Sequence, residues 1–146
     1  MQNIQNYFAP TIRSQSAFYG TIGDAKISLI DVRDVAAAAA AALLNEDLSG
    51  KTFELSGPEA VSYSELSERL SKRLGRTIRY VNLTPQQMIQ AMTSAGMPAA
   101  QASAVVELDD YYRSGRGAAS DQSLRQLIAR TPRTLDDFLN EILPQF

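Results

Sequence analysis

The pattern of hydrophobic and polar residues changes at Asp31. Before it, the segment AFYGTIGDAKISLI (17–30) places aromatic and β-branched residues on both sides of a turn region at 20–24, which predicts two short strands, the second over 26–30. After it, VRDVAAAAAAALL favours a helix, and an acidic residue in front of such a run accepts hydrogen bonds from free backbone N–H groups. We therefore expect a helix over 32–45.

The rest of the chain carries short elements with clear end signals. Ser62, Thr84 and Thr134 are each followed three residues later by Glu, Gln or Asp, the spacing of a helix-capping box. Glycine and proline mark where helices end. The pattern predicts further strands over 52–55 and 77–83, and helices over 63–74, 85–95, 99–113, 121–129 and 135–143.

Strands that alternate with helices are typical of α/β proteins. Here the helices outnumber the strands, and the strands are too short and too few for a well-covered parallel sheet. A strand such as 52–55 without neighbours would leave backbone groups free to pair with another chain. We expect one helix-rich domain over 1–146 that forms a homo-oligomer through exposed strand edges.

Composition excludes several classes of function. The 146 residues include no cysteine and no histidine, so thiolate chemistry, Ser-His-Asp hydrolysis and the usual zinc sites are excluded. The net charge of −2 and the scattered basic residues argue against nucleic-acid binding. The apolar run over 35–44 is too short to cross a bilayer, and the first residues do not resemble a secretion signal. We expect a cytoplasmic protein without a metal, nucleic-acid or membrane partner.

Three phrases in this order resemble the C-terminal half of NmrA-like proteins: MQNIQNYFAPTIRSQSAFYGTIGDAKISLIDVRDVAAAAAAALL, GKTFELSGPEAVSYSELSERLSKRLGRTIRYVNLTPQQ and RTPRTLDDFL. NmrA-like proteins are atypical, extended-type relatives of the short-chain dehydrogenases/reductases that bind NAD(P). The resemblance implies the C-terminal portion of a Rossmann-like fold, with few short strands and about six helices. It also implies that the N-terminal dinucleotide-binding half is absent.

The glycines agree with that implication. A dinucleotide-binding loop lies between a strand and a helix, so that the helix N-terminus faces the pyrophosphate. Gly20 and Gly23 lie between two predicted strands, and Gly115 and Gly117 follow a helix. No tyrosine has a lysine four residues later, the pair that short-chain dehydrogenases use in catalysis. We expect no cofactor and no dehydrogenase activity for this chain alone, and NAD(P) only if a separate dinucleotide-binding partner supplies the other half.

Five residues are candidates for a substrate pocket, and none is assigned a catalytic role. Asp31 and Arg33 either cap the helix and form an ion pair, or face a cleft at the carboxyl end of the preceding strand. The resemblance implies that Asn3, Tyr7 and Phe8 lie beside the nicotinamide and the substrate. Most of a pocket is apolar with a few polar groups, which suits this set.

Three functions remain open. The leading hypothesis is a non-catalytic or accessory NmrA-like domain, the substrate-side half without a phosphate-binding loop. The first alternative is an NAD(P)H-dependent oxidoreductase or a redox-sensing dinucleotide-binding regulator. The second alternative is a protein-interaction module.

Overall fold

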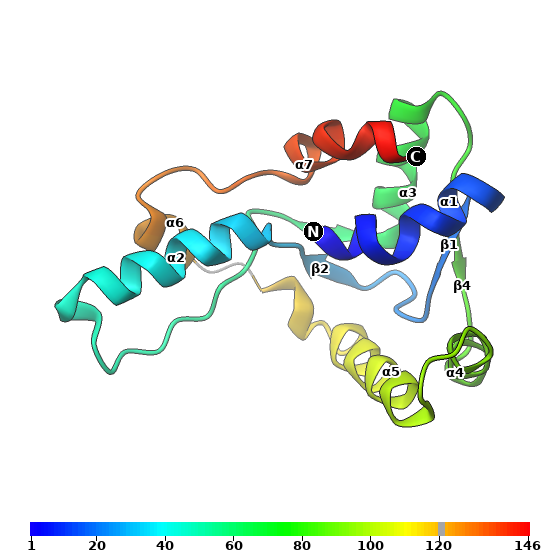
Figure 1. The fold of residues 1–146 in the computed structure, drawn as a ribbon, viewed down its shortest axis with the longest axis horizontal. Helices are drawn as coiled ribbons and strands as arrows, with labels where there is room; N and C mark the ends of the chain where they lie inside the picture. The colour runs from blue at the N-terminus through cyan, green and yellow to red at the C-terminus, as the bar shows by residue number, and fades with distance from the viewer. Residues whose placement is uncertain (120–121) are drawn as a thin grey trace.

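The computed structural model describes residues 1–119 and 122–146 and has an α/β, helix-rich fold (Figure 1). The described strands are β1 (Ala17–Gly20), β2 (Lys26–Ser28), β3 (Ala60–Ser62) and β4 (Arg79–Asn82). The described α-helices are α1 (Ala9–Gln15), α2 (Val32–Leu44), α3 (Tyr63–Leu74), α4 (Pro85–Ser94), α5 (Ala99–Arg113), α6 (Ser123–Ile128) and α7 (Leu135–Ile142). Single helical turns are η1 (Ile4–Phe8), η2 (Glu46–Leu48), η3 (Arg116–Ala118) and η4 (Leu143–Gln145).

The strands form two separate pairs. β1 and β4 are parallel, with Ala17 beside Arg79 and Gly20 beside Asn82, whereas β2 and β3 are antiparallel. The two strands predicted within 17–30 are therefore present, but they pair in different sheets. Because β1 and β4 run in the same direction, their carboxyl ends lie at one edge of the pair.

The predicted strand at 52–55 is wrong. Residues 51–57 have no regular secondary structure, although Thr52 and Glu54 are exposed and Phe53 and Leu55 are half-buried, as the alternation predicts. A strand exists only through hydrogen bonds to a neighbouring strand, and no described strand lies beside this segment. The strand edge on which the expected homo-oligomer rested is therefore not formed, and the homo-oligomer stays a prediction.

The hydrophobic core lies where the N-terminal segment, β1, α3 and α7 meet (Figure 1). Leu66 and Leu70, two members of the leucine stripe predicted for α3, are fully buried, and Leu74 is packed against the core. The other large, fully buried side chains of this core are Ile4, Ile12, Phe18, Val61, Leu135 and Leu139. The amphipathic pattern of α3 and α7 thus determines which of their faces points inward.

The predicted helix ends are confirmed. Capping boxes begin α3, α4 and α7, and Gly75 ends α3 with a left-handed φ of 63°. The helix predicted over 32–45 is α2, and Asp31 is its N-cap. The helix predicted over 121–129 corresponds to α6, although residue 121 lies outside the described residues.

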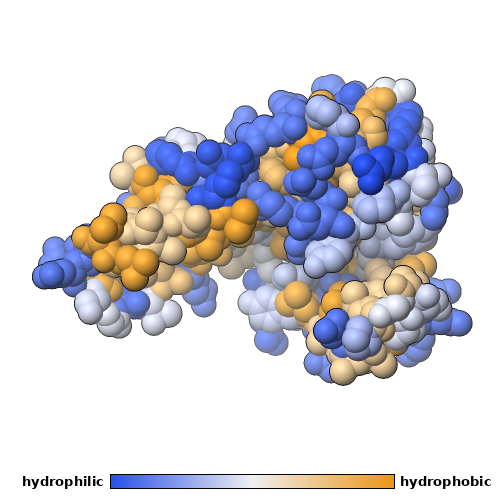
Figure 2. Space-filling model, viewed as in Figure 1, coloured by the Kyte–Doolittle hydropathy of each residue, from blue (hydrophilic) through white to orange (hydrophobic). Residues whose placement is uncertain are grey.

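Helix α2 extends away from the core, with α6 beside it (Figure 1). Ala38 is buried, but Leu43 and Leu44 are each 87% exposed and Val32 is 54% exposed. Figure 2 shows hydrophobic surface gathered over this helix. None of the helices in the described part of the chain is both long enough and apolar enough to span a membrane. We refer to the exposed apolar side chains of α2 as the α2 face.

We predict that Gly57→Ala lowers the free energy of unfolding by about 3 kcal/mol, because the added Cβ would overlap the Leu29 carbonyl group. Gly50→Ala is the control: Gly50 has a positive φ of 72° but open space around it, so only the left-handed strain of about 1 kcal/mol applies. Urea unfolding measures both variants, and equal losses would contradict the close approach at Gly57.

Candidate functional site

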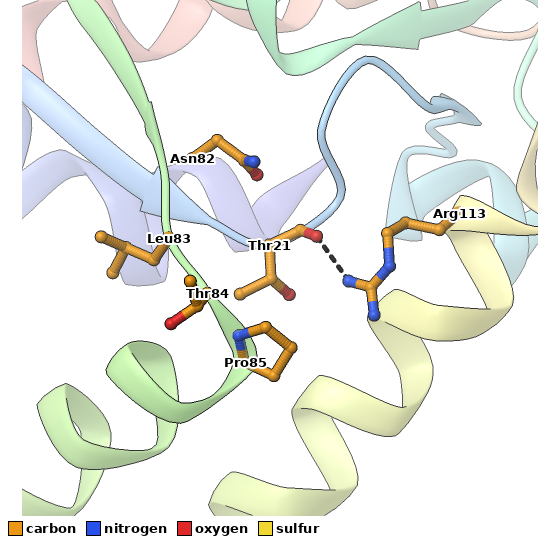
Figure 3. A pocket seen from close by; sticks show the side chains of 6 residues that line it. All are labelled: Thr21, Asn82, Leu83, Thr84, Pro85 and Arg113. Carbon is orange, nitrogen blue, oxygen red and sulfur yellow. Dashed lines mark hydrogen bonds between the residues drawn. The ribbon is translucent and has the colours of Figure 1, made fainter.

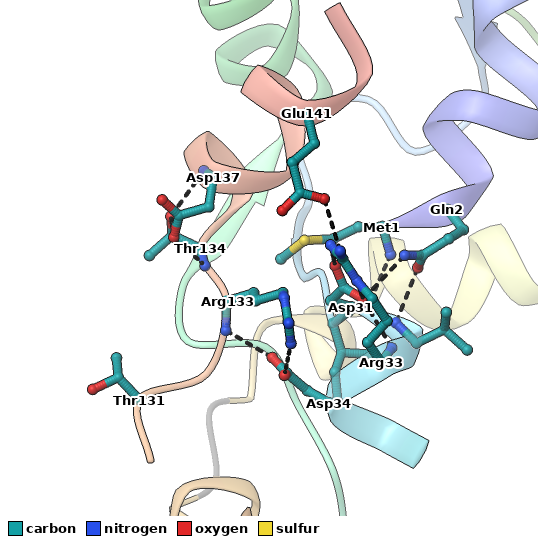
Figure 4. A network of polar contacts seen from close by, with 12 residues as sticks. Met1, Gln2, Asp31, Arg33, Asp34, Thr131, Arg133, Thr134, Asp137 and Glu141 are labelled. Atoms are coloured by element: carbon teal, nitrogen blue, oxygen red, sulfur yellow. Dashed lines mark hydrogen bonds and ion pairs between the residues drawn. The ribbon is translucent and has the colours of Figure 1, made fainter. Parts of the chain in front are cut away.

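A polar network lies at the start of α2 (Figure 4). Asp31 is fully buried and accepts hydrogen bonds from the Arg33 backbone N–H at 2.8 Å and from its guanidinium at 2.6 and 3.0 Å. The Gln2 side chain connects the N-terminal segment to the start of α2: it donates to Asp31 at 3.1 Å and accepts from the Val32 N–H at 3.0 Å. Arg33 also pairs with Glu141 at 2.8 Å. Asp31 therefore caps the helix and forms an ion pair, as the simpler interpretation expected.

Asp34, one turn further along α2, is buried as well. Its carboxylate accepts from the Arg133 backbone N–H at 2.7 Å, from the Arg133 guanidinium at 2.9 Å and from Arg130 at 2.6 Å. The sequence indicated only that Asp34 suits the positive end of a helix. Its partners lie about a hundred residues away, so no local signal could have identified them.

The charge of Asp31 is strongly stabilised. The Arg33 side chain that donates to it holds the pKa of the carboxyl well below its usual range, although burial opposes this. The same pairing raises the pKa of Arg33. At neutral pH the two groups are therefore a tightly bound ion pair rather than an acid or base available for catalysis.

The other three candidates lie on the N-terminal segment that Gln2 joins to α2. Asn3 is exposed and Tyr7 is 66% exposed. Phe8 is half-buried, stacked on Phe18 with ring centroids 4.9 Å apart and edge-on to Tyr63 at 5.4 Å. The structure thus places all five candidates along one network and its adjoining helix. A pocket-lining role for them stays a prediction.

An open pocket of about 350 Å³ lies elsewhere, at the carboxyl ends of β1 and β4 (Figure 3). Parallel strands commonly place ligands at this edge. Thr21 follows β1 and is buried, and Arg113 ends α5. The remaining lining runs from the last residue of β4 to the first residue of α4. The lining residues are Thr21, Asn82, Leu83, Thr84, Pro85 and Arg113.

A buried carboxylate supports this pocket from behind. Asp109 of α5 is 8% exposed and accepts a hydrogen bond of 2.5 Å from the Thr21 hydroxyl. Arg113 donates to the Thr21 carbonyl oxygen at 2.5 Å and pairs with Asp110. These contacts attach α5 to the end of β1 and fix the position of the Arg113 guanidinium.

Tyrosine rings lie next to the same strand end. Tyr63 and Tyr80 are edge-on with centroids 5.2 Å apart, and both rings contact the position that a Cβ of Gly20 would occupy. Burial raises the pKa of Tyr80 to about 12 and, together with the nearby Asp109 carboxylate, raises the pKa of Tyr63 further. Both phenols therefore stay protonated at neutral pH, and the Tyr80 hydroxyl donates to the Asn82 side-chain oxygen at 2.9 Å.

The sequence did not identify this pocket. It did predict the local pieces, namely a strand before Thr84, a helix from Pro85 and a turn after Gly20. What it lacked was the parallel pairing of β1 with β4, which brings residues about sixty positions apart to one edge. The sequence showed where each of the two strands ends, but it did not show that the two strands pair or in which register.

A dinucleotide pyrophosphate does not fit the described residues. Gly20 ends β1 and Gly23 lies between β1 and β2, and Gly115 and Gly117 lie after α5, so neither pair joins a strand to the N-terminus of an α-helix. Backbone N–H groups at such a junction are what bind phosphate in Rossmann-like folds. The described part of the chain therefore has an open pocket at the ends of β1 and β4 but no strand-to-helix glycine loop.

The comparisons with known proteins concern nearly the whole chain. The NAD(P)H azoreductase of Xenophilus azovorans is 43% identical over 138 residues, which cover 94% of this chain and 48% of that protein. The crystal structure of an NADPH-dependent quinone oxidoreductase from Escherichia coli is similar with a TM-score of 0.86 at 29% identity, over 95% of this chain and 51% of that chain. Both of these proteins are NAD(P)H-dependent reductases by name. No family model matches the chain.

These reductase relatives support the resemblance to the NAD(P)-binding superfamily of NmrA-like and short-chain dehydrogenase-like proteins. A Staphylococcus aureus nucleoside-diphosphate-sugar epimerase shares the fold, with a TM-score of 0.80 at 23% identity over 90% of this chain and 46% of that chain. The predicted fold class, a partial Rossmann-like α/β fold, is confirmed. The chain spans about half the length of the curated relatives it matches. The homologues favour the oxidoreductase alternative over the accessory domain.

We predict that the Asp31 ion pair makes stability depend on acidic pH. Because folding lowers the pKa of Asp31, its contribution is fully present above the unfolded pKa of about 4 and is lost as the pH falls below that value toward the folded pKa. The unfolding free energies of the native chain and of Asp31→Asn should therefore converge between about pH 5 and pH 2.

Urea titrations across this pH range make the measurement. Asp24→Asn, which removes an exposed carboxylate from the loop between β1 and β2, is the matched control. A difference between native chain and Asp31→Asn that stays constant from neutral to acidic pH would contradict the ion-pair assignment.

Proposed function

We propose that this chain is the C-terminal, substrate-side part of an NAD(P)H-dependent reductase that acts on quinone-like or azo acceptors. The single observation that carries the proposal is the 43% identity to an NAD(P)H azoreductase across 94% of the chain. The similarity to a quinone oxidoreductase, also solved as its NADPH complex, supports the same reaction class. In this proposal the acceptor lies at the pocket formed by the ends of β1 and β4.

The dinucleotide is then held mainly by a second, dinucleotide-binding half. Two observations support this division: the described residues contain no strand-to-helix glycine loop, and the chain matches only about half of its relatives' length. The chain's own contribution is to bind and orient the acceptor and to shield it from water. Such positioning supplies a large part of the rate in two-substrate reactions.

The α2 face and the segment 52–55 are where this dinucleotide-binding half docks. The alanines of α2 allow close approach to a sheet, and Leu43 and Leu44 are 87% exposed without a covering element. Further along the chain, 52–55 keeps a strand-like alternation but pairs with no described strand. Adding a strand to an open sheet edge satisfies the backbone groups of such a segment. A second copy of this chain is the competing occupant.

The proposal is tested with a chimera in which this chain replaces the matched part of the Xenophilus azovorans azoreductase. We expect the chimera to oxidise NADPH when an azo dye or benzoquinone is added, because the acceptor side is then rejoined to a dinucleotide-binding half. The decrease in NADPH absorbance over time measures the reaction.

The azoreductase remainder without this chain is the control for background oxidation. A chimera that folds and binds NADPH, yet reduces neither acceptor, would contradict the proposed function.

The docking surface is tested with Leu43→Glu combined with Leu44→Glu. In the isolated chain these exposed positions should change the free energy of unfolding by no more than about 0.5 kcal/mol. In the chimera, where the two side chains are buried, the same pair should cost at least about 3 kcal/mol. Thermal and urea unfolding give both values.

Ser49→Glu, which adds a charge to an exposed residue of the loop after α2, is the control and should be neutral in both proteins. Equal effects of the leucine pair in the isolated chain and in the chimera would remove the α2 face as the docking surface. A dimer of the isolated chain that the leucine pair dissociates would assign the face to a second copy instead.

A further inference from the structure

The hydrogen-bonding groups of the pocket at the ends of β1 and β4 are unevenly used. The Asn82 side-chain oxygen already accepts from the Gly23 N–H at 3.0 Å and from the Tyr80 hydroxyl at 2.9 Å. The Thr84 hydroxyl oxygen accepts from the Gln87 N–H at 3.3 Å. The acceptor capacity of these two side chains is thus largely filled from within the protein.

The unused capacity consists mainly of donors. Among the described residues, no acceptor contacts the Asn82 amide nitrogen or the Thr84 hydroxyl proton, and Arg113 retains N–H groups beyond those bound to Thr21 and Asp110. No carboxylate lines the pocket, since Asp109 lies behind Thr21 and Asp110 is outside the lining. These free side-chain donors favour a ligand group that accepts hydrogen bonds.

Arg113 is held in place for such a group. Its guanidinium is held between the Thr21 carbonyl oxygen and Asp110, and its side chain is 32% exposed. Binding a ligand would therefore cost little side-chain conformational entropy. Figure 3 shows Arg113 directed from α5 toward Thr21, across the pocket from Thr84 and Pro85. A guanidinium in a fixed orientation binds planar or trigonal oxyanions better than a mobile lysine does.

We infer that this pocket binds an oxyanion substituent, a carboxylate or sulfonate, on an aromatic acceptor. The oxyanion accepts from Arg113, Asn82 and Thr84, while Leu83 and Pro85 supply the apolar surface for the ring that carries it. The inference rests on the proposed function for its identification of the ligand as the substrate. It makes Arg113 and Asn82 specificity-determining residues.

The test measures binding of three small aromatic probes to the 146-residue chain by amide NMR. Toluene-4-sulfonate carries the oxyanion, 4-methylacetophenone a neutral acceptor, and benzylammonium only donors. We expect toluene-4-sulfonate to shift the amide signals of Leu83 and Thr84 and the side-chain amide of Asn82, 4-methylacetophenone to shift them more weakly, and benzylammonium to leave them unchanged.

Two variants locate the binding. Arg113→Gln should weaken sulfonate binding by about tenfold, the loss expected for one hydrogen bond to a charged group. Asn82→Asp keeps the oxygen that accepts from Gly23 and Tyr80 but replaces the donor by a negative charge, so it should weaken binding at least as much. Arg116→Gln is the matched control, because it removes the same charge from a residue that stacks on Tyr111 outside the lining.

The inference is overturned if benzylammonium shifts the same signals as strongly as the sulfonate, if no probe shifts them, or if Arg113→Gln has no more effect than Arg116→Gln. Its failure is distinguishable from failure of the proposed function. A chimera that reduces neutral quinones while the chain binds no sulfonate would reject the oxyanion site alone, and sulfonate binding with an inactive chimera would reject the reductase proposal.

Discussion

Two buried carboxylates, Asp31 and Asp34, hold distant parts of the chain against the start of α2. Asp31 binds the N-terminal segment through Gln2, and Asp34 binds the stretch before α7 through Arg133. A buried carboxylate that loses its partners carries a large desolvation penalty. Moving either segment away from α2 is therefore strongly unfavourable. The N-terminal segment and α7, both of which contribute side chains to the core, are joined to the start of α2 by this network.

That constraint also determines what is left uncovered. With its first turn anchored by the two carboxylates, α2 extends outward, and α6 packs beside it. Its far end exposes Leu43 and Leu44, and the strand-like segment 52–55 pairs with no described strand. Large exposed apolar patches mark interaction surfaces. The same anchor that completes the core therefore presents the surface through which a dinucleotide-binding half would join it.

The candidate site divides into a part that could be predicted and a part that could not. The cap at Asp31 and the ion pair of Arg33 follow from residues next to each other in the sequence, and the structure has both. The pocket between Thr21 and Arg113 depends on the pairing of β1 with β4 and on contacts ninety residues apart, so neither spacing nor composition indicates it. The resemblance to NmrA-like proteins supplied the reductase alternative, and the homologues favour it.

By itself, the sequence determined the helices and their ends, because a cap, a capping box or a left-handed glycine acts within three or four residues. Ser62 and Thr84 cap the starts of α3 and α4, and Gly75 ends α3, as their local sequence predicts. Only the tertiary structure decided which strands exist, because a strand needs a partner that the local sequence does not specify. Residues 52–55 alternate like a strand and form none, whereas 60–62 become β3 because β2 lies beside them.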